Sequence, residues 1–173
     1  NPCVTGFSFI ICHREELKKC EGQARSLSLD LYDQWKTMEK DGKWRFTSPT
    51  HVVLAFSQAL KEMEEEGGIP ARHARYAENN RILIEKMAEL GIRPYIEGPL
   101  QGPIITTFYY PEHVEFSFQE MYQYIKERGY AIYPGKVTDA DTFRIGNIGE
   151  IYPEDMEKLA QIIRDFLNEK KEA

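Results

Sequence analysis

The sequence of 173 residues predicts an α/β fold, and three observations lead to this prediction. Long stretches carry an apolar residue at every third or fourth position, as amphipathic helices do. In the second half of the chain these stretches alternate with short apolar runs of strand length, which is typical of a small α/β sandwich. Residues 6–12 form a further, nearly continuous apolar run, and this run predicts a strand that is buried on both faces.

The composition is unfavourable for several classes of protein. Hydrophobic residues make up 42% of the chain and charged residues 29%, as in ordinary globular proteins. The net charge of −6 disfavours a nucleic-acid or anionic-membrane surface, and no apolar run approaches the ~20 residues of a membrane helix. Cys3, Cys12 and Cys20 are odd in number and lack CxxC spacing, which indicates reduced thiols in a cytoplasmic protein. The four histidines show no metal-ligand spacing, so no metal site is expected.

The first half of the chain predicts an extended segment followed by two helices. Residues 22–33 alternate leucines with polar residues, as in a segment that lies extended against another surface. Tyr32, Trp35 and Met38 then follow at helical spacing, and a longer helix begins near Pro49, a residue that suits a first helical turn. The apolar stripe of this longer helix is Val52, Phe56, Ala59, Leu60 and Met63.

The second half alternates helices with short strands. Apolar spacing predicts a long helix from residue 70 to Gly91, where the glycine suits a helix C-cap. Ser117 and Glu120 form a capping box at the start of the next helix, and Pro153 opens the last one. The predicted strands are residues 93–96, 104–110, 130–133 and 142–147. The stripe predicted to be buried on the last helix is Met156, Leu159, Ile163, Phe166 and Leu167.

The last predicted strand carries a positive charge. Arg144 interrupts the apolar run of Thr142, Phe143 and Ile145, and we expect it to be buried. A buried unpaired charge costs several kcal/mol, so the guanidinium needs an anion, and its planar donors match a carboxylate or a phosphonate. Two partners remain open at this point. One is an internal aspartate or glutamate that holds the sheet together, and the other is an acidic ligand.

The residues after Arg144 allow another reading, an RNA-binding Ile-Gly-x-x-Gly loop. Residues 146–149 contain no lysine or arginine, and the acidic Glu150 follows them. RNA binding at such a loop depends on positive charge, so the sequence disfavours this interpretation.

Thr47 and Ser48 lie just before the longer helix of the first half. The free N–H groups and the dipole at a helix N-terminus favour an anion such as a phosphate. The alternative is that either hydroxyl is a plain N-cap with no ligand.

Four segments together resemble the 2-aminoethylphosphonate–pyruvate transaminases. They are residues 22–35, 43–51 (KWRFTSPTH), 133–136 (YPGK) and 143–149 (FRIGNIG), and the likeness spans essentially the whole chain. This family is similar to the alanine–glyoxylate branch of the fold-type I enzymes that use pyridoxal 5'-phosphate (PLP). The resemblance implies a homodimer in which each subunit has a large PLP-binding domain and a small C-terminal α/β domain.

The resemblance also implies an activity and two site residues. The activity is transfer of the amino group of 2-aminoethylphosphonate to pyruvate, which gives phosphonoacetaldehyde and alanine. Thr47 would bind the PLP phosphate of the neighbouring subunit, and Arg144 would hold the acidic group of either substrate. Residues 1–66 would be a remnant of the large domain, and residues 67–173 the small α/β-sandwich domain.

One departure from the family concerns the lysine that forms the Schiff base with PLP. The family places this lysine a few residues before the strand that corresponds to residues 6–12, yet residues 1–5 contain no lysine. We therefore expect the C-terminal half of an enzyme, with no catalytic lysine of its own and no activity alone. Two alternatives remain: a non-catalytic, ferredoxin-like binding or dimerisation module, and a related PLP transaminase with another acidic substrate.

Overall fold

The computed structural model describes residues 6–135 and 140–172, the last without its side chain. Contacts within the chain divide it into two compact units, Pro2–Glu62 and Met63–Ala173, and each is described here by itself. The segment 1–5 and Lys136, which belong to the regions compared with the transaminases, lie outside the described residues. The assignment of residues 1–66 to a large domain and 67–173 to a small one stays a prediction.

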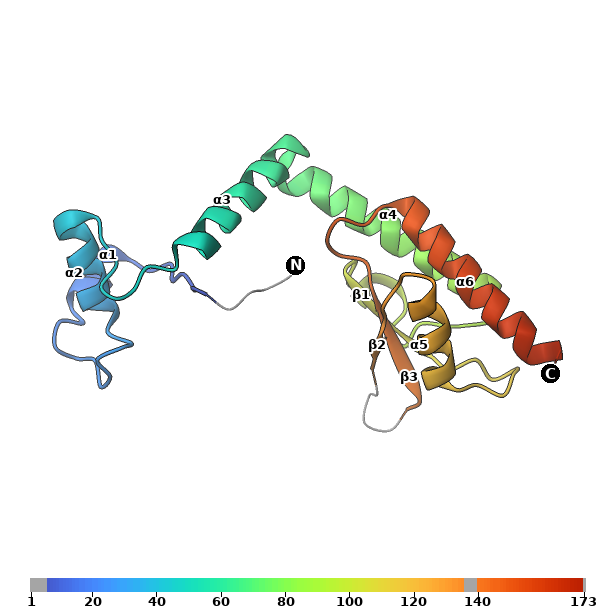
Figure 1. Ribbon diagram of the computed structural model, residues 1–173. Coiled ribbons are helices and arrows are strands. Elements are labelled where there is room, and N and C mark those ends of the chain that lie inside the picture. The colour runs from blue at the N-terminus through green and yellow to red at the C-terminus, as the bar shows by residue number, and fades with distance from the viewer. Residues whose placement is uncertain (1–5, 136–139, 173) are drawn as a thin grey trace. The chain divides into compact units, whose positions relative to one another are not determined.

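The unit Pro2–Glu62 is built from helices. They are α1 (Arg14–Lys18), α2 (Leu31–Asp41) and α3 (Thr50–Glu65), of which α3 continues into the second unit (Figure 1). The side chain of Asp30 caps α2 by accepting a hydrogen bond from the backbone N–H of Asp33 at 3.0 Å. The helices predicted around Trp35 and after Pro49 are therefore confirmed.

The strand predicted over residues 6–12 is wrong. These residues have no regular secondary structure, and none of the described residues 6–62 is buried. Phe9 and Ile11 are 68% and 90% exposed, although the ring of Phe7 lies 5.5 Å from that of Phe56. A strand requires a partner that accepts and donates its backbone hydrogen bonds, and residues 6–62 as described contain no strand.

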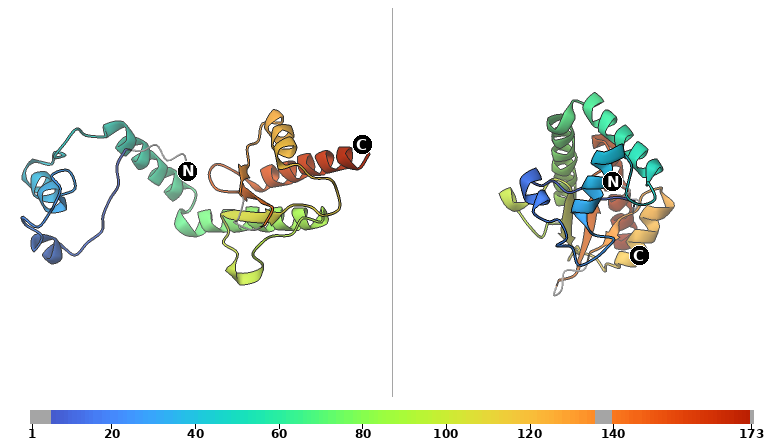
Figure 2. Two further views of the ribbon diagram at one scale, coloured as in Figure 1. Left: turned by 90° about the horizontal axis from the view of Figure 1, so that it is seen from below. Right: turned by 90° about the vertical axis from the view of Figure 1, so that its left-hand side faces the viewer.

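The unit Met63–Ala173 contains a three-stranded antiparallel sheet in the order β1-β3-β2. Its strands are β1 (Ile105–Tyr109), β2 (Tyr133–Pro134) and β3 (Thr142–Gly146). Figures 1 and 2 show α6 running alongside α4 next to this sheet. The helices of this unit are α4 (Gly68–Glu89), α5 (Phe118–Glu127) and α6 (Pro153–Glu172), and η1 (Gly98–Leu100) is a short 3₁₀ turn.

The core of this unit lies between one face of the sheet and the three helices. Phe108 of β1 and Phe143 and Ile145 of β3 are almost completely buried there, because alternate residues of a strand point to the same face. Leu83 of α4 and Met121 of α5 contribute from the helices. The stripe predicted on the last helix is confirmed, since Met156, Leu159, Ile163, Phe166 and Leu167 are all buried.

Two of the four predicted strands are shorter than expected. Residues 93–96 form only a single bridge, between Pro94 and Phe108, and the strand predicted over residues 130–133 is reduced to β2. Pro94 lies within the first segment and Pro134 directly follows the second, and a proline has no backbone N–H to donate to a neighbouring strand. Strands β1 and β3 agree with the prediction to within one residue at each end.

The helices in the described part of the chain include none that combines the length and the apolar character needed to cross a membrane.

Candidate active site

Arg144 lies in the middle of β3, the central strand, on the face of the sheet that the helices do not cover. Its neighbours in the chain, Phe143 and Ile145, point into the core, so the guanidinium points the other way and is exposed. Across the sheet it pairs in register with Thr107 of β1 and Tyr133 of β2. The expectation of a buried charge is therefore wrong, because the alternation of the strand separates Arg144 from its apolar neighbours.

The stem of Arg144 lies directly over Gly135, a buried glycine next to β2. A Cβ atom on Gly135 would lie 2.7 Å from Cδ of Arg144 and 2.9 Å from its Nε, well inside van der Waals contact. Only a residue without a side chain leaves room for Arg144 in this position. Gly135 therefore determines the direction of the guanidinium across the open face of the sheet.

The guanidinium of Arg144 has no ion pair or hydrogen bond with any residue that the structure describes. An internal aspartate or glutamate partner, one of the two possibilities left open by the sequence, is thus not found in residues 6–135 and 140–172. Because the group is exposed to water, the fold does not require an anion beside it. All of its donors are available for a carboxylate, phosphonate or phosphate that comes from outside this part of the chain.

The loop after β3 is tied firmly to α4. Asn147 is fully buried, and its Nδ2 donates to the carbonyl oxygens of Tyr76 at 3.0 Å and of Pro103 at 2.8 Å. The backbone N–H of Gly149 donates to the hydroxyl of Tyr76 at 3.2 Å. Gly149 has a φ of 98°, a left-handed conformation that favours glycine. The second glycine of the FRIGNIG segment thus permits the turn that brings the loop back onto the helix.

Arg75 of α4 is the centre of a second set of contacts to this loop. One of its terminal nitrogens donates to the carbonyl oxygens of Gly149 and Ile151, each at 2.8 Å. Its Nε donates to Glu66 at 2.6 Å, and Arg72 holds the other oxygen of Glu66 at 2.7 Å. The hydrogen bonds from Arg75 and then Arg72 lower the pKa of the Glu66 carboxyl to about 2.

Sequence reasoning missed Glu66, Arg75, Tyr76 and Asn147. The hydrogen bonds of Arg75 and Tyr76 to the loop join residues more than 70 positions apart. Nothing in the spacing of the residues indicates such a pair. The one usable signal was Asn147, a polar residue at the end of a predicted buried strand, which needs hydrogen-bond partners when it is buried.

Thr47 lies in the other unit, three residues before α3 begins, and is exposed. The first backbone bonds of α3 run from the N–H groups of Val52 and Val53 to the carbonyl oxygen of Pro49. The hydroxyls of Ser48 and Thr50 bond to each other at 2.9 Å. None of the described residues forms a hydrogen bond with the hydroxyl of Thr47, which is therefore not a plain N-cap and can donate to an anion in front of the helix.

Arg45 holds the segment that carries Thr47 in place. Its guanidinium pairs with Asp33 of α2 at 2.8 Å and donates to the carbonyl oxygen of Leu27 at 2.6 Å. The side chain of Arg45 is 11% exposed, so this pair is well shielded from water. These contacts tie the approach to α3 to the start of α2. Thr47 and Arg144 belong to different units, and each is placed only within its own unit.

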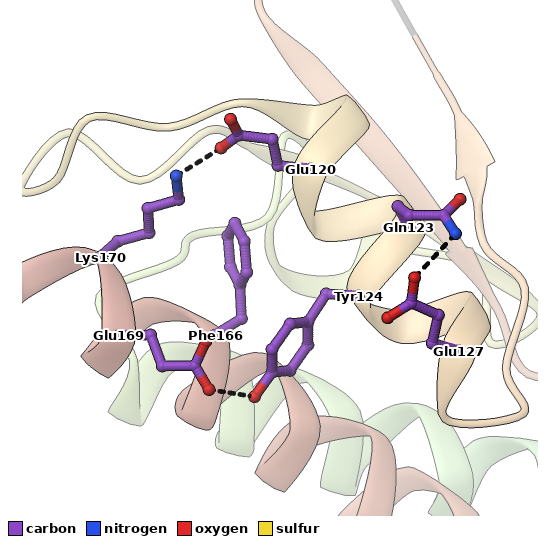
Figure 3. A pocket seen from close by; sticks show the side chains of 7 residues that line it. All are labelled: Glu120, Gln123, Tyr124, Glu127, Phe166, Glu169 and Lys170. Carbon is purple, nitrogen blue, oxygen red and sulfur yellow. Dashed lines mark hydrogen bonds and ion pairs between the residues drawn. The ribbon is translucent and has the colours of Figure 1, made fainter. Parts of the chain in front are cut away.

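Two hollows of the second unit lie elsewhere. The first has a volume of about 440 Å³, lies between α5 and α6, and is acidic at its rim (Figure 3). Its polar groups are engaged with one another: Lys170 pairs with Glu120, and the hydroxyl of Tyr124 donates to Glu169, which raises the tyrosine's pKa. A hollow with three carboxylates and one ammonium repels an acidic ligand. The second, of about 470 Å³, is lined by Gly91, Arg93, Tyr110, Glu112 and His113.

Comparisons with known proteins identify relatives along almost the whole chain. It is 58% identical over 170 residues to a 2-aminoethylphosphonate–pyruvate transaminase of Lysinibacillus sphaericus, a match that covers 96% of this chain and 46% of that protein. The resemblance predicted from the sequence is confirmed. A transaminase of the same name from Vibrio cholerae is 59% identical over 163 residues, covering 92% of this chain and 44% of that protein. The chain thus spans less than half the length of these two relatives.

A further relative is a fused protein. The bifunctional phosphonoacetaldehyde hydrolase/aminoethylphosphonate transaminase of Clostridioides difficile is 58% identical over 172 residues, covering 97% of this chain and 27% of that protein. No family model matches the chain.

Solved structures of aminotransferases share the fold. An aspartate aminotransferase of Thermus thermophilus, from subgroup IV, superimposes with a TM-score of 0.64 at 25% identity, over 84% of this chain and 40% of that one. An alanine–glyoxylate aminotransferase of Nostoc superimposes with a TM-score of 0.68 at 19% identity, over 88% of this chain and 42% of that one, and supports the fold alone. The predicted class, part of a fold-type I PLP transferase with α/β structure, is confirmed.

Proposed function

We propose that this chain is the C-terminal part of a PLP-dependent transaminase that moves the amino group of 2-aminoethylphosphonate to pyruvate. The products would be phosphonoacetaldehyde and alanine. The observation that carries the proposal is Arg144, an exposed guanidinium without an internal partner in the described residues. It lies in the FRIGNIG segment of a chain that is 58% identical to transaminases of this name.

Arg144 would bind the acidic group of each substrate in turn. The phosphonate of 2-aminoethylphosphonate and the carboxylate of pyruvate both present two or more oxygens to the planar donors of a guanidinium. Gly135 keeps the stem of Arg144 in place, and Thr107 and Tyr133 flank it across the sheet. The part of Arg144 is therefore to hold and orient the substrate by its charged end.

The residues before α3 fit the phosphate of PLP. The hydroxyl of Thr47 forms no hydrogen bond with another described residue. It lies just before the N-terminus of α3, a helix of 16 residues whose first N–H groups point out of that end. When bound, PLP supplies the electron sink that amino-group transfer requires. The lysine that attaches it would come from outside residues 6–173, and Thr47 would serve the PLP of the neighbouring subunit in a homodimer.

Residues 1–66 would then complete a large PLP-binding domain, and residues 67–173 would form the small domain. Exposed apolar side chains of the first unit support this division, because an intact large domain would cover them. The location would be the cytoplasm, where the exposed thiols of Cys12 and Cys20 stay reduced. The pathway would be the breakdown of phosphonates.

Arg144→Lys in a full-length transaminase that contains this stretch tests the proposal. Lysine keeps the charge but loses the bidentate fork, a loss of roughly 2–5 kcal/mol when the contact is desolvated. We expect kcat/KM for 2-aminoethylphosphonate and the KM for pyruvate to worsen by about 30-fold or more. The melting temperature should change little, because the side chain is exposed.

Arg128→Lys is the matched control, since Arg128 is also exposed and also belongs to the second unit. Among the described residues it contacts Tyr124, by donating to its carbonyl oxygen and lying over its ring, and it is not part of the proposed site. A large fall in melting temperature with normal kinetics in Arg144→Lys would make Arg144 a structural residue and refute the site. Comparing 2-aminoethylphosphonate with alanine and aspartate as amino donors would separate the proposed activity from that of a transaminase with another acidic substrate.

A further inference from the structure

We propose that Arg75 is a positioning residue for Arg144: it holds the loop after β3 against α4 and so fixes the strand end that carries Arg144. This inference rests on the proposed function, in which Arg144 binds the substrate. It assigns a part in substrate binding to a half-buried residue that does not itself touch the substrate.

The contacts of Arg75 join three segments of the same unit. Its Nε binds Glu66, directly after α3, and a terminal nitrogen binds the carbonyl oxygens of Gly149 and Ile151. Its guanidinium also lies over the ring of Tyr152, 4.9 Å from the centroid. The side chain is 12% exposed, so these bonds are made largely out of water, where they are strong.

Arg75 acts beside other contacts that hold this loop, namely those of Asn147 and Tyr76 and a hydrogen bond of 2.8 Å from Nδ2 of Asn79 to the carbonyl oxygen of Ile151. Within the residues that the structure describes, strand β2 pairs with β3 only at Arg144 and Phe143. On the other side, β1 pairs with β3 up to Gly146, and one more backbone bond joins the N–H of Asn147 to the carbonyl oxygen of Ile104. Beyond that point Arg75 and the side chains beside it on α4 determine where the chain runs. Arg144 lies five residues before Gly149, on the same strand and loop.

A displacement at the loop is expected to reach the guanidinium. Charge-assisted hydrogen bonds need donor–acceptor distances near 2.7–2.9 Å, so a bidentate contact tolerates only a few tenths of an ångström. A misplacement of about 1 Å in a positioning group can cost up to about 100-fold in rate. Without Arg75 the carbonyl oxygen of Gly149 loses its side-chain donor, and that of Ile151 keeps only Asn79. This loosening should therefore weaken substrate binding without removing any group that contacts the substrate.

Arg72 provides a matched control. It is on the same helix and binds the same carboxylate, with its Nε 2.7 Å from Glu66, but it makes no hydrogen bond to the loop within the described structure. Arg75→Lys and Arg72→Lys each replace a guanidinium by an ammonium that can still pair with Glu66. Only Arg75→Lys removes a guanidinium that bonds both to Glu66 and to the carbonyl oxygens of Gly149 and Ile151. A compact ammonium cannot reach all three of these acceptors.

The experiment compares the two variants in the full-length transaminase with PLP bound. We expect Arg75→Lys to raise the KM for both 2-aminoethylphosphonate and pyruvate by about tenfold, with kcat changed less than threefold. Arg72→Lys should leave both KM values and kcat near those of the parent enzyme. Hydrogen exchange, followed on peptides that cover residues 141–152, should be faster in Arg75→Lys than in Arg72→Lys. In an Arg144→Ala background, Arg75→Lys should raise KM no further.

Equal KM values for Arg75→Lys and Arg72→Lys would overturn the proposal, as would an additive effect of Arg75→Lys in the Arg144→Ala background. Unchanged exchange over residues 141–152 in Arg75→Lys would overturn it as well, whatever the kinetics. A failure of the proposed function looks different. In that case Arg144→Lys alone has normal kinetics, while the exchange comparison still decides whether Arg75 holds the loop.

Discussion

Gly135→Ala is the smallest change that should disturb Arg144 without touching its charge. The new Cβ would lie 2.7 Å from Cδ of Arg144 and closer still to its Cγ. To restore a normal carbon–carbon contact of ~3.5 Å, Cδ must move by about 0.8 Å and Cγ by more. Hydrogen bonds to the substrate span a narrower range than this, roughly 0.5 Å. At least one of the two bonds of a bidentate contact should be lost, at about 1.5–3 kcal/mol.

That loss predicts a rise of roughly 10- to 100-fold in the KM for 2-aminoethylphosphonate, measured in the full-length enzyme at saturating pyruvate. The loss of stability should be small, because the exposed side chain of Arg144 can move aside and Gly135 does not have a positive φ. Alanine also lowers the conformational entropy of the unfolded chain, which stabilises the fold by about 0.4–1 kcal/mol and offsets part of the cost. Gly102→Ala is the control, since its Cβ would meet no atom within 4 Å. If Gly135→Ala binds substrate normally while Arg144→Lys does not, the close approach of Gly135 has no part in binding.

Two further predictions concern the stability and the surface of the 173-residue chain. The Glu66 carboxyl has a pKa of about 2 in the fold against an ordinary value of 4.5, so its contribution to the free energy of unfolding is complete above about pH 4.5 and is lost as the pH falls toward 2. Urea unfolding at pH 5 and pH 3 should therefore show a smaller drop in the free energy of unfolding for Glu66→Gln than for the parent chain, and equal drops would contradict this prediction. Leu54 and Ile11 are 63% and 90% exposed, so the chain should bind a hydrophobic dye or self-associate, and the double variant Leu54→Ser/Ile11→Ser should bind less dye and associate less. A parent chain that is monomeric and binds no dye would contradict the proposal that a large domain covers these side chains.

Helices were predicted well from the sequence because their signal is local. The stripe on α6 repeats every three or four residues, and Pro153 marks its start, so the helix and its buried face follow from one stretch of chain. The run of residues 6–12 has an equally clear apolar pattern, but a strand forms only if another strand lies beside it. No signal within residues 6–12 tells whether that partner is present.

The site residues stay a prediction. Arg144 was singled out because it interrupts an apolar run before two glycines, and Thr47 because it lies before a helix. The burial of Arg144 was misjudged because Arg144 was assigned the burial of its apolar neighbours in the strand. With Phe143 and Ile145 facing the core, the period of two residues places Arg144 on the open face. The hydrogen bond from Arg75 to the carbonyl oxygen of Gly149 joins residues 74 positions apart, and no local sequence pattern indicates such a contact.

Arg75 and Arg144 illustrate how the surroundings of a guanidinium decide its role. Arg75 is mostly buried, and a carboxylate and two carbonyl oxygens accept its hydrogen bonds, as a buried charge requires. It has little capacity left for a ligand and serves to hold the loop. Arg144 is exposed and has no partner in the described residues, so its donors are open to an incoming anion. The hydrogen bonds that satisfy Arg75 also hold the loop after β3, while the guanidinium of Arg144 has no partner in the described residues. For that reason we propose that Arg144, and not Arg75, binds the acidic end of the substrate.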